Sequence, residues 1–206
     1  MSPEVTQSGP LRGPQVEAGK SKENLGGLRI ACLVDDRFEQ VELTSPKAAF
    51  EAAGAVVDIV SRHRELTGMN HHTPGDRFTA GVELDQAHPR DYDALLLPGG
   101  VINGDSLRML PKAQAFARAI VAAGKPVAVI CHGGWLLISS GLVGGRTITS
   151  WPTLQDDYRN AGANWMDQPV VVDGNWVSSR KPDDLPVFNR AAIDVFARSR
   201  GERRAA

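Results

Sequence analysis

The sequence predicts an α/β protein, a layered sandwich of helices around a mostly parallel central sheet. Two observations lead to this prediction. Short, nearly continuous apolar runs are typical of strands that are buried on both faces of a parallel sheet. These runs alternate along the chain with helical patterns, as in proteins built from strand–helix–strand units. In such folds, ligands bind beyond the carboxyl ends of the strands.

In the first half of the chain, residues 28–34 are the first apolar run and predict a buried strand. Residues 48–53 are rich in alanine and predict a helix, because a glycine, a common helix-ending residue, follows them. Residues 55–60 predict the second strand. Residues 62–78 mix His, Gly and Pro and predict a loop with room for a short hairpin.

The second half repeats the alternation. Residues 94–97 predict a buried strand that ends in Pro98-Gly99-Gly100, and residues 126–130 predict another that runs into Cys131. The other expected elements are helices at 112–123, 135–140, 154–161 and 185–197, and strands near 147–150 and 170–172.

Length and composition indicate one globular domain, which we expect at residues 28–197. The hydrophobic share of 42% and the charged share of 23% lie near globular averages, which excludes wholesale disorder. Residues 1–27 are rich in Ser, Pro, Gly, Glu and Lys. They predict a disordered tail, because they cannot bury enough apolar surface to offset the entropy of ordering. Residues 198–206 are expected to be a frayed end.

The net charge and the motifs of the chain limit the partners and cofactors that we expect. The net charge of −1 provides no basic field for a phosphate backbone, so we expect no nucleic-acid partner. The chain has no apolar run of about 18 residues and no secretory signal, and it has only two cysteines. We therefore expect a cytoplasmic protein with no membrane contact. The chain has no glycine-rich nucleotide-binding fingerprint and no zinc-ligand spacing, so no cofactor or metal is expected. The histidines other than His132 are expected in solvated loops: His63, His71, His72 and His88.

Cys131 lies where a predicted strand ends, followed by two glycines and an apolar helix. A residue on such a sharp corner stands clear of the sheet, often with a strained backbone, as a nucleophile requires. The free N–H groups at a helix start are expected to lower the pKa of its thiol and to favour the thiolate. Cys32 lies inside a predicted strand and is expected to be an inert core residue.

Three side chains and one backbone segment near this corner are candidates for proton transfer and oxyanion binding. His132 either acts on a substrate proton or only supports the corner, since adjacent side chains on a tight turn diverge. Glu39 and Glu42 follow the first strand at the same edge, and their spacing does not distinguish them. Pro98-Gly99-Gly100 ends a strand without side-chain bulk, so its backbone amides are free to face an oxyanion.

Five sequence blocks carry a resemblance to a known family. They are DRFEQVEL (36–43), DALLLPGG (93–100), GKPVAVICHG (124–133), SWP (150–152) and SSRKPDDL (178–185). In this order they closely resemble the ThiJ/PfpI superfamily, specifically its PfpI intracellular protease branch. The resemblance runs from about residue 28 to residue 197 and implies a flavodoxin-like sandwich related to class I glutamine amidotransferases.

The resemblance also implies roles for residues. It implies a nucleophilic Cys131, a Glu39 that contacts the thiol, and His132 as the third member of the site. The backbone amides of Gly100 and His132 would form the oxyanion hole. In the protease branch, an acidic residue of a neighbouring subunit completes a Cys-His-acid triad. Asp105 is the nearest candidate, in a loop that is one residue longer than is usual for the family.

The pocket is expected to include Gly99, Gly133 and Trp135. Gly134-Trp135 departs from the family, whose members more often carry Pro and a polar residue there, and Trp135 would narrow the pocket or change which substrates fit. By the same resemblance we expect a homo-oligomer, a dimer or a hexamer, because the family builds its sites near subunit contacts.

Three functions are compatible with these residues. The first is a stress-related, cysteine-dependent enzyme that acts on small reactive carbonyls or their protein adducts, as a glyoxalase or deglycase does. The second is a PfpI-type cysteine peptidase with a Cys-His-acid triad. The third is a stress chaperone or redox sensor in which Cys131 is an oxidisable switch.

Overall fold

The computed structural model of the chain describes residues 25–205, with side chains as far as residue 201. The strands are β1 (Arg29–Leu33), β2 (Phe38–Glu39), β3 (Val56–Ser61), β4 (Glu65–Asn70), β5 (Thr73–Thr79), β6 (Val82–Glu83), β7 (Ala94–Leu97), β8 (Val127–Ile130), β9 (Thr147–Ile148), β10 (Asn164–Trp165), β11 (Val170–Asp173) and β12 (Trp176–Ser179). The helices are α1 (Gln40–Ala52), α2 (Val101–Arg108), α3 (Pro111–Ala122), α4 (Trp135–Ser139), α5 (Gln155–Asn160) and α6 (Leu185–Ala205), and the short 3-10 turns are η1 (Pro89–Asp91), η2 (Cys131–Gly134), η3 (Pro152–Leu154) and η4 (Pro182–Asp184).

A seven-stranded sheet forms the middle layer, in the order β11-β12-β8-β7-β1-β3-β6. Every neighbouring pair in it is parallel except β11 with β12. The strands β7 and β8 are buried at every position, and β1 at all but its first residue. The continuous apolar runs of the sequence are therefore the central strands, and the predicted mostly parallel sandwich is confirmed.

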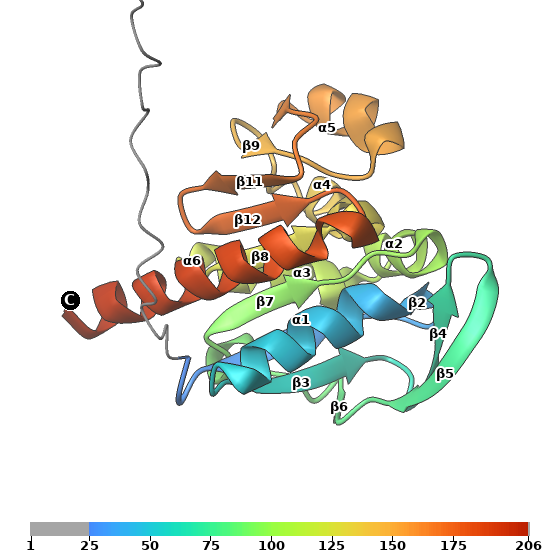
Figure 1. Ribbon diagram of the computed structural model, residues 1–206, viewed down its shortest axis with the longest axis horizontal. Coiled ribbons are helices and arrows are strands. Elements are labelled where there is room, and N and C mark those ends of the chain that lie inside the picture. Colours follow the sequence, from blue (N-terminus) through green and yellow to red (C-terminus); the bar gives the residue numbers. More distant parts are fainter. Residues whose placement is uncertain (1–24, 206) are drawn as a thin grey trace, which may run out of the picture.

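Helices cover both faces of this sheet (Figure 1). On one face α1 and α6 bury a cluster that includes Phe50, Phe188 and Phe196. On the other face α2 to α5 bury a second cluster, with Phe116 and Tyr158 among its largest side chains. Because helices pack against both faces of the sheet, the ends of its strands are held at fixed positions.

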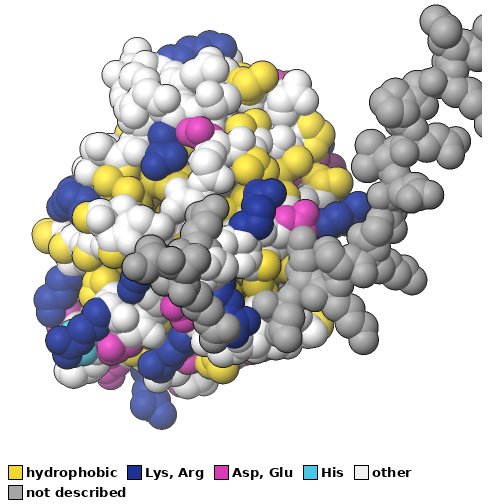
Figure 2. All heavy atoms as spheres, turned by 90° about the vertical axis from the view of Figure 1, so that its left-hand side faces the viewer, with side chains coloured by type: hydrophobic (Ala, Val, Ile, Leu, Met, Phe, Trp, Pro, Cys, Tyr) yellow, Lys and Arg dark blue, Asp and Glu magenta, His cyan; other side chains and the backbone are white. Residues whose placement is uncertain are grey.

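A smaller sheet, β2-β4-β5, stands beside the end of the main sheet at which the parallel strands finish (Figure 1). Its β4–β5 hairpin lies in the segment predicted as a loop with room for a hairpin. Figure 2 shows the opposite edge of the molecule, where basic and acidic side chains are interspersed. None of the helices between residues 25 and 205 is long and apolar enough to cross a membrane.

Four local features differ from the sequence-based expectations. Leu25 was assigned to the tail, but it is fully buried, and its N–H donates to the Ala53 carbonyl at 2.8 Å. Helix α6 runs to Ala205, past the expected frayed end at 198. Helix α2 replaces the loop after Gly100, although its Asn-Gly-Asp run is a poor helix former. Strand β12 was not expected, because its serines are polar residues in a fully buried strand.

Candidate active site

Cys131 lies at the corner between β8 and η2, as the sequence predicts, and 7% of its surface is exposed. Its φ is +59°, in the left-handed region that residues with a side chain rarely adopt. Such strain concentrates at functional sites, where the surrounding structure enforces it. The corner therefore presents the sulfur at the carboxyl end of the sheet, where a ligand can reach it.

Glycines let three backbone segments meet behind the sulfur. A Cβ on Gly99 would lie 2.6 Å from the Cys131 Cβ, and one on Gly133 would lie 2.5 Å from the Leu97 carbonyl oxygen. Gly100 has φ +94°, and its Cβ would lie 2.6 Å from the Glu39 nitrogen. Of these glycines, only Gly100 lines the cavity; the other two were expected there and instead permit the close packing around it.

The electrostatic environment of the thiol differs from the sequence-based expectation. Burial, the largest cause, and the neighbouring Glu42 raise the pKa of Cys131 above its ordinary value. The backbone N–H groups of Gly100 and His132 hydrogen-bond the sulfur and act to lower that pKa. The two amides implied by the family resemblance do face the sulfur, but the expected net lowering is wrong, because the corner is buried.

The carboxyl group beside the thiol belongs to Glu42. It is fully buried in the first turn of α1, and its Oε2 accepts the Gly99 N–H at 2.8 Å. Burial raises its pKa to about 8, so the carboxyl is protonated at neutral pH. Its Oε1 is buried with no hydrogen-bond partner in the described part of the chain. A protonated carboxyl with a free oxygen can donate to the sulfur when it becomes a thiolate, or to a substrate oxygen.

The implied contact between Glu39 and the thiol is not present. Glu39 ends β2, and its two carboxylate oxygens accept the His71 N–H at 3.1 and 3.3 Å. The reason is geometric: Glu39 has an extended backbone in a strand, whereas Glu42 lies one helical turn later and points towards Cys131. Glu39 still lines the cavity, at the side of the β4–β5 hairpin.

His132 contacts the sulfur directly, since its Nδ1 lies 3.1 Å from Cys131 Sγ. The imidazole lies between two indoles, with centroid distances of 5.1 Å to Trp135 and 5.8 Å to Trp151. Burial lowers the pKa of His132 to about 4, so the ring is neutral at pH 7 and able to accept a proton. No carboxylate between residues 25 and 201 is hydrogen-bonded to the imidazole.

Asp105 and Trp135 stand away from the cavity. Asp105 is exposed on α2 and does not line the cavity in its own chain. Its part in a triad across a subunit contact therefore stays a prediction. Trp135 was expected to narrow the pocket or to change which substrates fit. It does not line the cavity; its ring contacts the His132 imidazole, and its Nε1–H donates to Asp157 at 2.8 Å.

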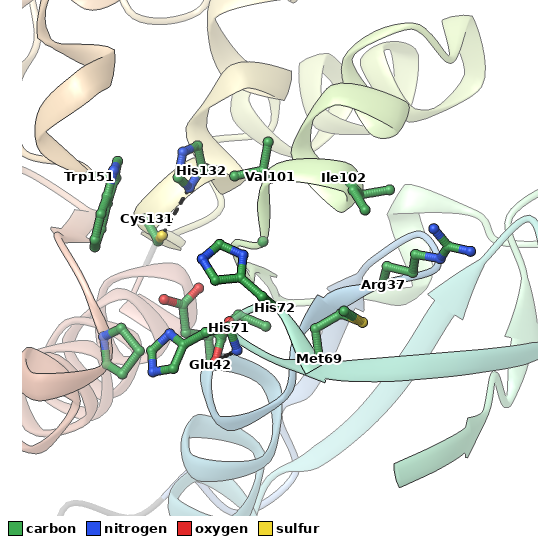
Figure 3. A pocket seen from close by; sticks show the side chains of 13 residues that line it. Arg37, Glu42, Met69, His71, His72, Val101, Ile102, Cys131, His132 and Trp151 are labelled. Atoms are coloured by element: carbon green, nitrogen blue, oxygen red, sulfur yellow. Dashed lines mark hydrogen bonds between the residues drawn. The ribbon is translucent and has the colours of Figure 1, made fainter. Parts of the chain in front are cut away.

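A cavity of about 440 Å³ opens in front of the sulfur (Figure 3). Histidines predicted to be solvated loop residues belong to it: His71 and His72 form the β4–β5 turn and line the cavity, although both are exposed. The lining residues are Arg37, Glu39, Glu42, Met69, His71, His72, Gly100, Val101, Ile102, Cys131, His132, Trp151 and Pro182. No group of three His, Cys, Asp or Glu side chains in residues 25–201 is placed to hold a metal ion.

Sequence reasoning missed most of the wall opposite the sulfur. Arg37 and Met69 line the cavity. Arg37 lies in the DRFEQVEL block, but the resemblance implied no role for it, and no pattern surrounds Met69. Arg37 and His71 share one detectable property, a positive φ of 59° and 57° respectively. The sequence signal for His71 is the tight turn that joins the two strands of the hairpin. Nothing comparable marks Arg37.

Comparison with known proteins agrees with this geometry. The family model described as DJ-1/PfpI matches residues 28–195. A deglycase from Pyrococcus abyssi is 42% identical over 171 residues, which cover 82% of this chain and 99% of that protein. The putative cysteine protease YraA from Bacillus subtilis is also 42% identical, over 82% of this chain and 98% of that protein.

A solved structure supports the same assignment. It is a two-domain protein from Anabaena variabilis with DJ-1/ThiJ/PfpI-like and ferritin-like domains. It superposes with a TM-score of 0.75 at 30% identity, over 81% of this chain and 49% of that one. The flavodoxin-like architecture implied by the sequence blocks is therefore confirmed. From its matching sequence, its sandwich fold and its strained cysteine corner, the chain belongs to the DJ-1/PfpI family.

Proposed function

We propose that the protein is a cysteine-dependent enzyme of the glyoxalase or deglycase type, which acts on small 2-oxoaldehydes or their adducts on proteins. The observation that carries this proposal is the set of four groups around Cys131: a neutral imidazole at 3.1 Å from Sγ, a protonated buried carboxyl, and two backbone amides. The imidazole and the carboxyl can accept and return protons, and the amides can stabilise an oxyanion. The deglycase name of the Pyrococcus abyssi relative supports it.

The first step is addition of the sulfur to the aldehyde. His132 Nδ1 accepts the thiol proton while Cys131 Sγ forms a bond to the aldehyde carbon. The carbonyl oxygen becomes an oxyanion, which the amides of Gly100 and His132 stabilise. Imidazolium then returns the proton to this oxygen and completes a hemithioacetal. A ring whose pKa is about 4 releases that proton readily at neutral pH.

The second step moves hydrogen between two carbons. His132 removes the proton from the hemithioacetal carbon while the Glu42 carboxyl donates its proton to the adjacent ketone oxygen, which gives an enediol. His132 returns its proton to the second carbon, and Glu42 recovers a proton from the first oxygen, which leaves a thioester of a 2-hydroxy acid. Water then hydrolyses the C–S bond, releases the acid and restores the thiol. No net oxidation occurs.

The test is lactate formation from methylglyoxal by purified protein, followed by chromatography. We expect turnover in the wild-type chain, and a loss of at least about a thousandfold in C131A, because the covalent step is removed. The matched control is C32A, which changes the other thiol and leaves turnover within about twofold. Lactate formation by C131A at the wild-type rate would overturn the proposal.

A cysteine peptidase is the second candidate, favoured by the direct contact of His132 with the sulfur and by the YraA name. It requires Asp105 of a neighbouring subunit to orient His132. Cleavage of a fluorogenic peptide that is lost in both H132N and D105N, with no lactate formed, would establish it. Protection of an aggregating client that survives in C131A would instead indicate a chaperone.

We further propose that the enzyme works in the cytoplasm as a homo-oligomer, a dimer or a hexamer, and binds no nucleic acid. The exposed apolar pair Val101 and Ile102 at the start of α2, beside Asp105, supports a subunit contact next to the cavity. Light scattering at micromolar concentration tests the oligomer, and a monomer would contradict it.

A further inference from the structure

The cavity has two chemically different ends. Figure 3 shows Cys131, His132 and Trp151 at one end and the guanidinium of Arg37 at the other, with His72 and Met69 between them. The buried carboxyl of Glu42 lies at the sulfur end, beside Cys131. A substrate whose carbonyl reaches the sulfur would therefore extend its distal part towards Arg37.

A second hollow of about 460 Å³ continues from the Arg37 end. It shares Arg37, Met69 and His72 with the cavity and adds Arg77 from β5. Two guanidinium groups from separate segments of the chain thus line one hollow. Guanidinium groups bind carboxylates and phosphates through paired N–H donors, so this arrangement is suited to an anionic oxygen group.

One carboxylate, Asp36, lines this hollow beside the arginines. Its Oδ1 accepts the Thr67 N–H at 2.7 Å, and its Oδ2 forms a long ion pair of 3.8 Å with Arg37 Nε. An exposed ion pair of that length is weak, so an anionic ligand can compete with Asp36 for Arg37. Asp76 accepts the Gln40 side-chain N–H at 2.7 Å. Within residues 25–201, Arg77 has no carboxylate at ion-pairing distance, so its donors are available to a ligand.

Backbone contacts fix the position of Arg37 although its side chain is 59% exposed. Its N–H donates to the Thr67 carbonyl at 3.0 Å, and its φ of +59° is enforced at the end of the first loop. Disfavoured backbone conformations concentrate at ligand-binding sites, so the backbone of Arg37 favours a role in binding. The same β4 residue, Thr67, holds both Asp36 and Arg37.

We propose that Arg37 and Arg77 form an anion subsite, so that the substrates are 2-oxoaldehydes that carry a carboxylate or a phosphate distal to the reacting carbonyl. This rests on the proposed function for the reaction itself. The binding of the anionic group does not depend on turnover, so the two ideas can fail separately.

The kinetic experiment compares 4,5-dioxopentanoate with its uncharged methyl ester, which has the same reacting carbonyls. We expect kcat/KM to be about tenfold higher for the acid, mainly through KM. R37Q should remove this preference, and R77Q should reduce it. R64Q is the matched control, because Arg64 is exposed and lines neither hollow. Equal kcat/KM values for acid and ester, or a preference that survives in R37Q/R77Q, would overturn the subsite.

A binding experiment separates the subsite from the reaction. C131S is titrated with 4-oxopentanoate, with its methyl ester and with dihydroxyacetone phosphate, and binding is followed by isothermal titration calorimetry. We expect the anions to bind at least about tenfold more tightly than the ester, and R37Q to remove the difference. Tighter binding of the phosphate assigns phosphorylated substrates, and tighter binding of the acid assigns carboxylated ones. If neither anion binds better than the ester, the subsite is wrong even where methylglyoxal is turned over.

Discussion

The two cysteines of the chain have the same side chain but lie in different surroundings. Cys32 is fully buried inside β1, whereas Cys131 is 7% exposed at the corner after β8. Burial is the largest cause that raises the pKa of each thiol. Burial alone therefore does not identify a nucleophile. What separates them is a strained corner, two facing amides, an imidazole and a carboxyl, all of which Cys131 has.

The largest expected difference between the two regions is in turnover. C131A should lose at least about a thousandfold of the methylglyoxal activity, and C32A less than about twofold. In contrast, C32A should lower the free energy of unfolding by roughly 1–2 kcal/mol, because it leaves a small void in the apolar cluster that α1 and α6 cover. Urea denaturation measures this. A C32A variant that is inactive while fully folded would break the comparison.

Alkylation with iodoacetamide should separate the two thiols by about a hundredfold in rate. Cys131 faces the cavity, whereas Cys32 becomes accessible only when the sheet opens. Mass spectrometry of tryptic peptides after graded times at pH 7.5 gives both rates. Equal slow labelling would mean that the cavity does not admit reagents to the corner.

Glu42 should make the free energy of unfolding depend on pH. Because burial raises the pKa of Glu42 to about 8, the folded state holds a proton that the unfolded chain loses above about pH 4.5. The stability it confers is complete below pH 4.5 and is lost as pH rises towards 8, a fall of roughly 3 kcal/mol between pH 5 and 8.

E42Q should flatten this fall, since the amide keeps an acceptor for the Gly99 N–H and never ionises. E39Q should speed hydrogen exchange at the His71 amide, because its N–H donates to the Glu39 carboxylate. Urea midpoints at several pH values measure the slopes. A slope in E42Q equal to that of the wild type would assign the pH dependence to another group.

The smallest expected effect concerns the packing behind the sulfur. In G99A the new methyl group would lie 2.4 Å from Glu42 Oε2 and 2.6 Å from the Cys131 Cβ. We expect about a tenfold loss of turnover and a cost of roughly 2 kcal/mol in unfolding free energy. G81A is the matched control, because nothing lies within 4 Å of a Cβ there. If G99A and G81A have the same turnover and the same unfolding free energy, the tight contact at Gly99 does not position the thiol.

Sequence reasoning succeeded where local pattern and tertiary structure agree. The buried strands and the corner at Cys131 follow from apolar runs and glycines, and both are present. Spacing could not distinguish Glu39 from Glu42, because the choice depends on where β2 ends and α1 begins. The family resemblance assigned Glu39 to the thiol, and this assignment is wrong, since Glu42 lies there. Sequence reasoning missed the cavity roles of His71 and Arg37, because these depend on how the β4–β5 hairpin folds over a strand end that is distant in sequence.

The left-handed backbone at Cys131 has a consequence for how this protein can change over time. Glycine adopts that conformation without the penalty of about 1–2 kcal/mol that a side chain incurs there. A Cys131→Gly chain would thus relieve local strain while losing all covalent chemistry. Selection for heat resistance alone would therefore favour this inactive variant. Only a screen that also selects for turnover will retain the cysteine.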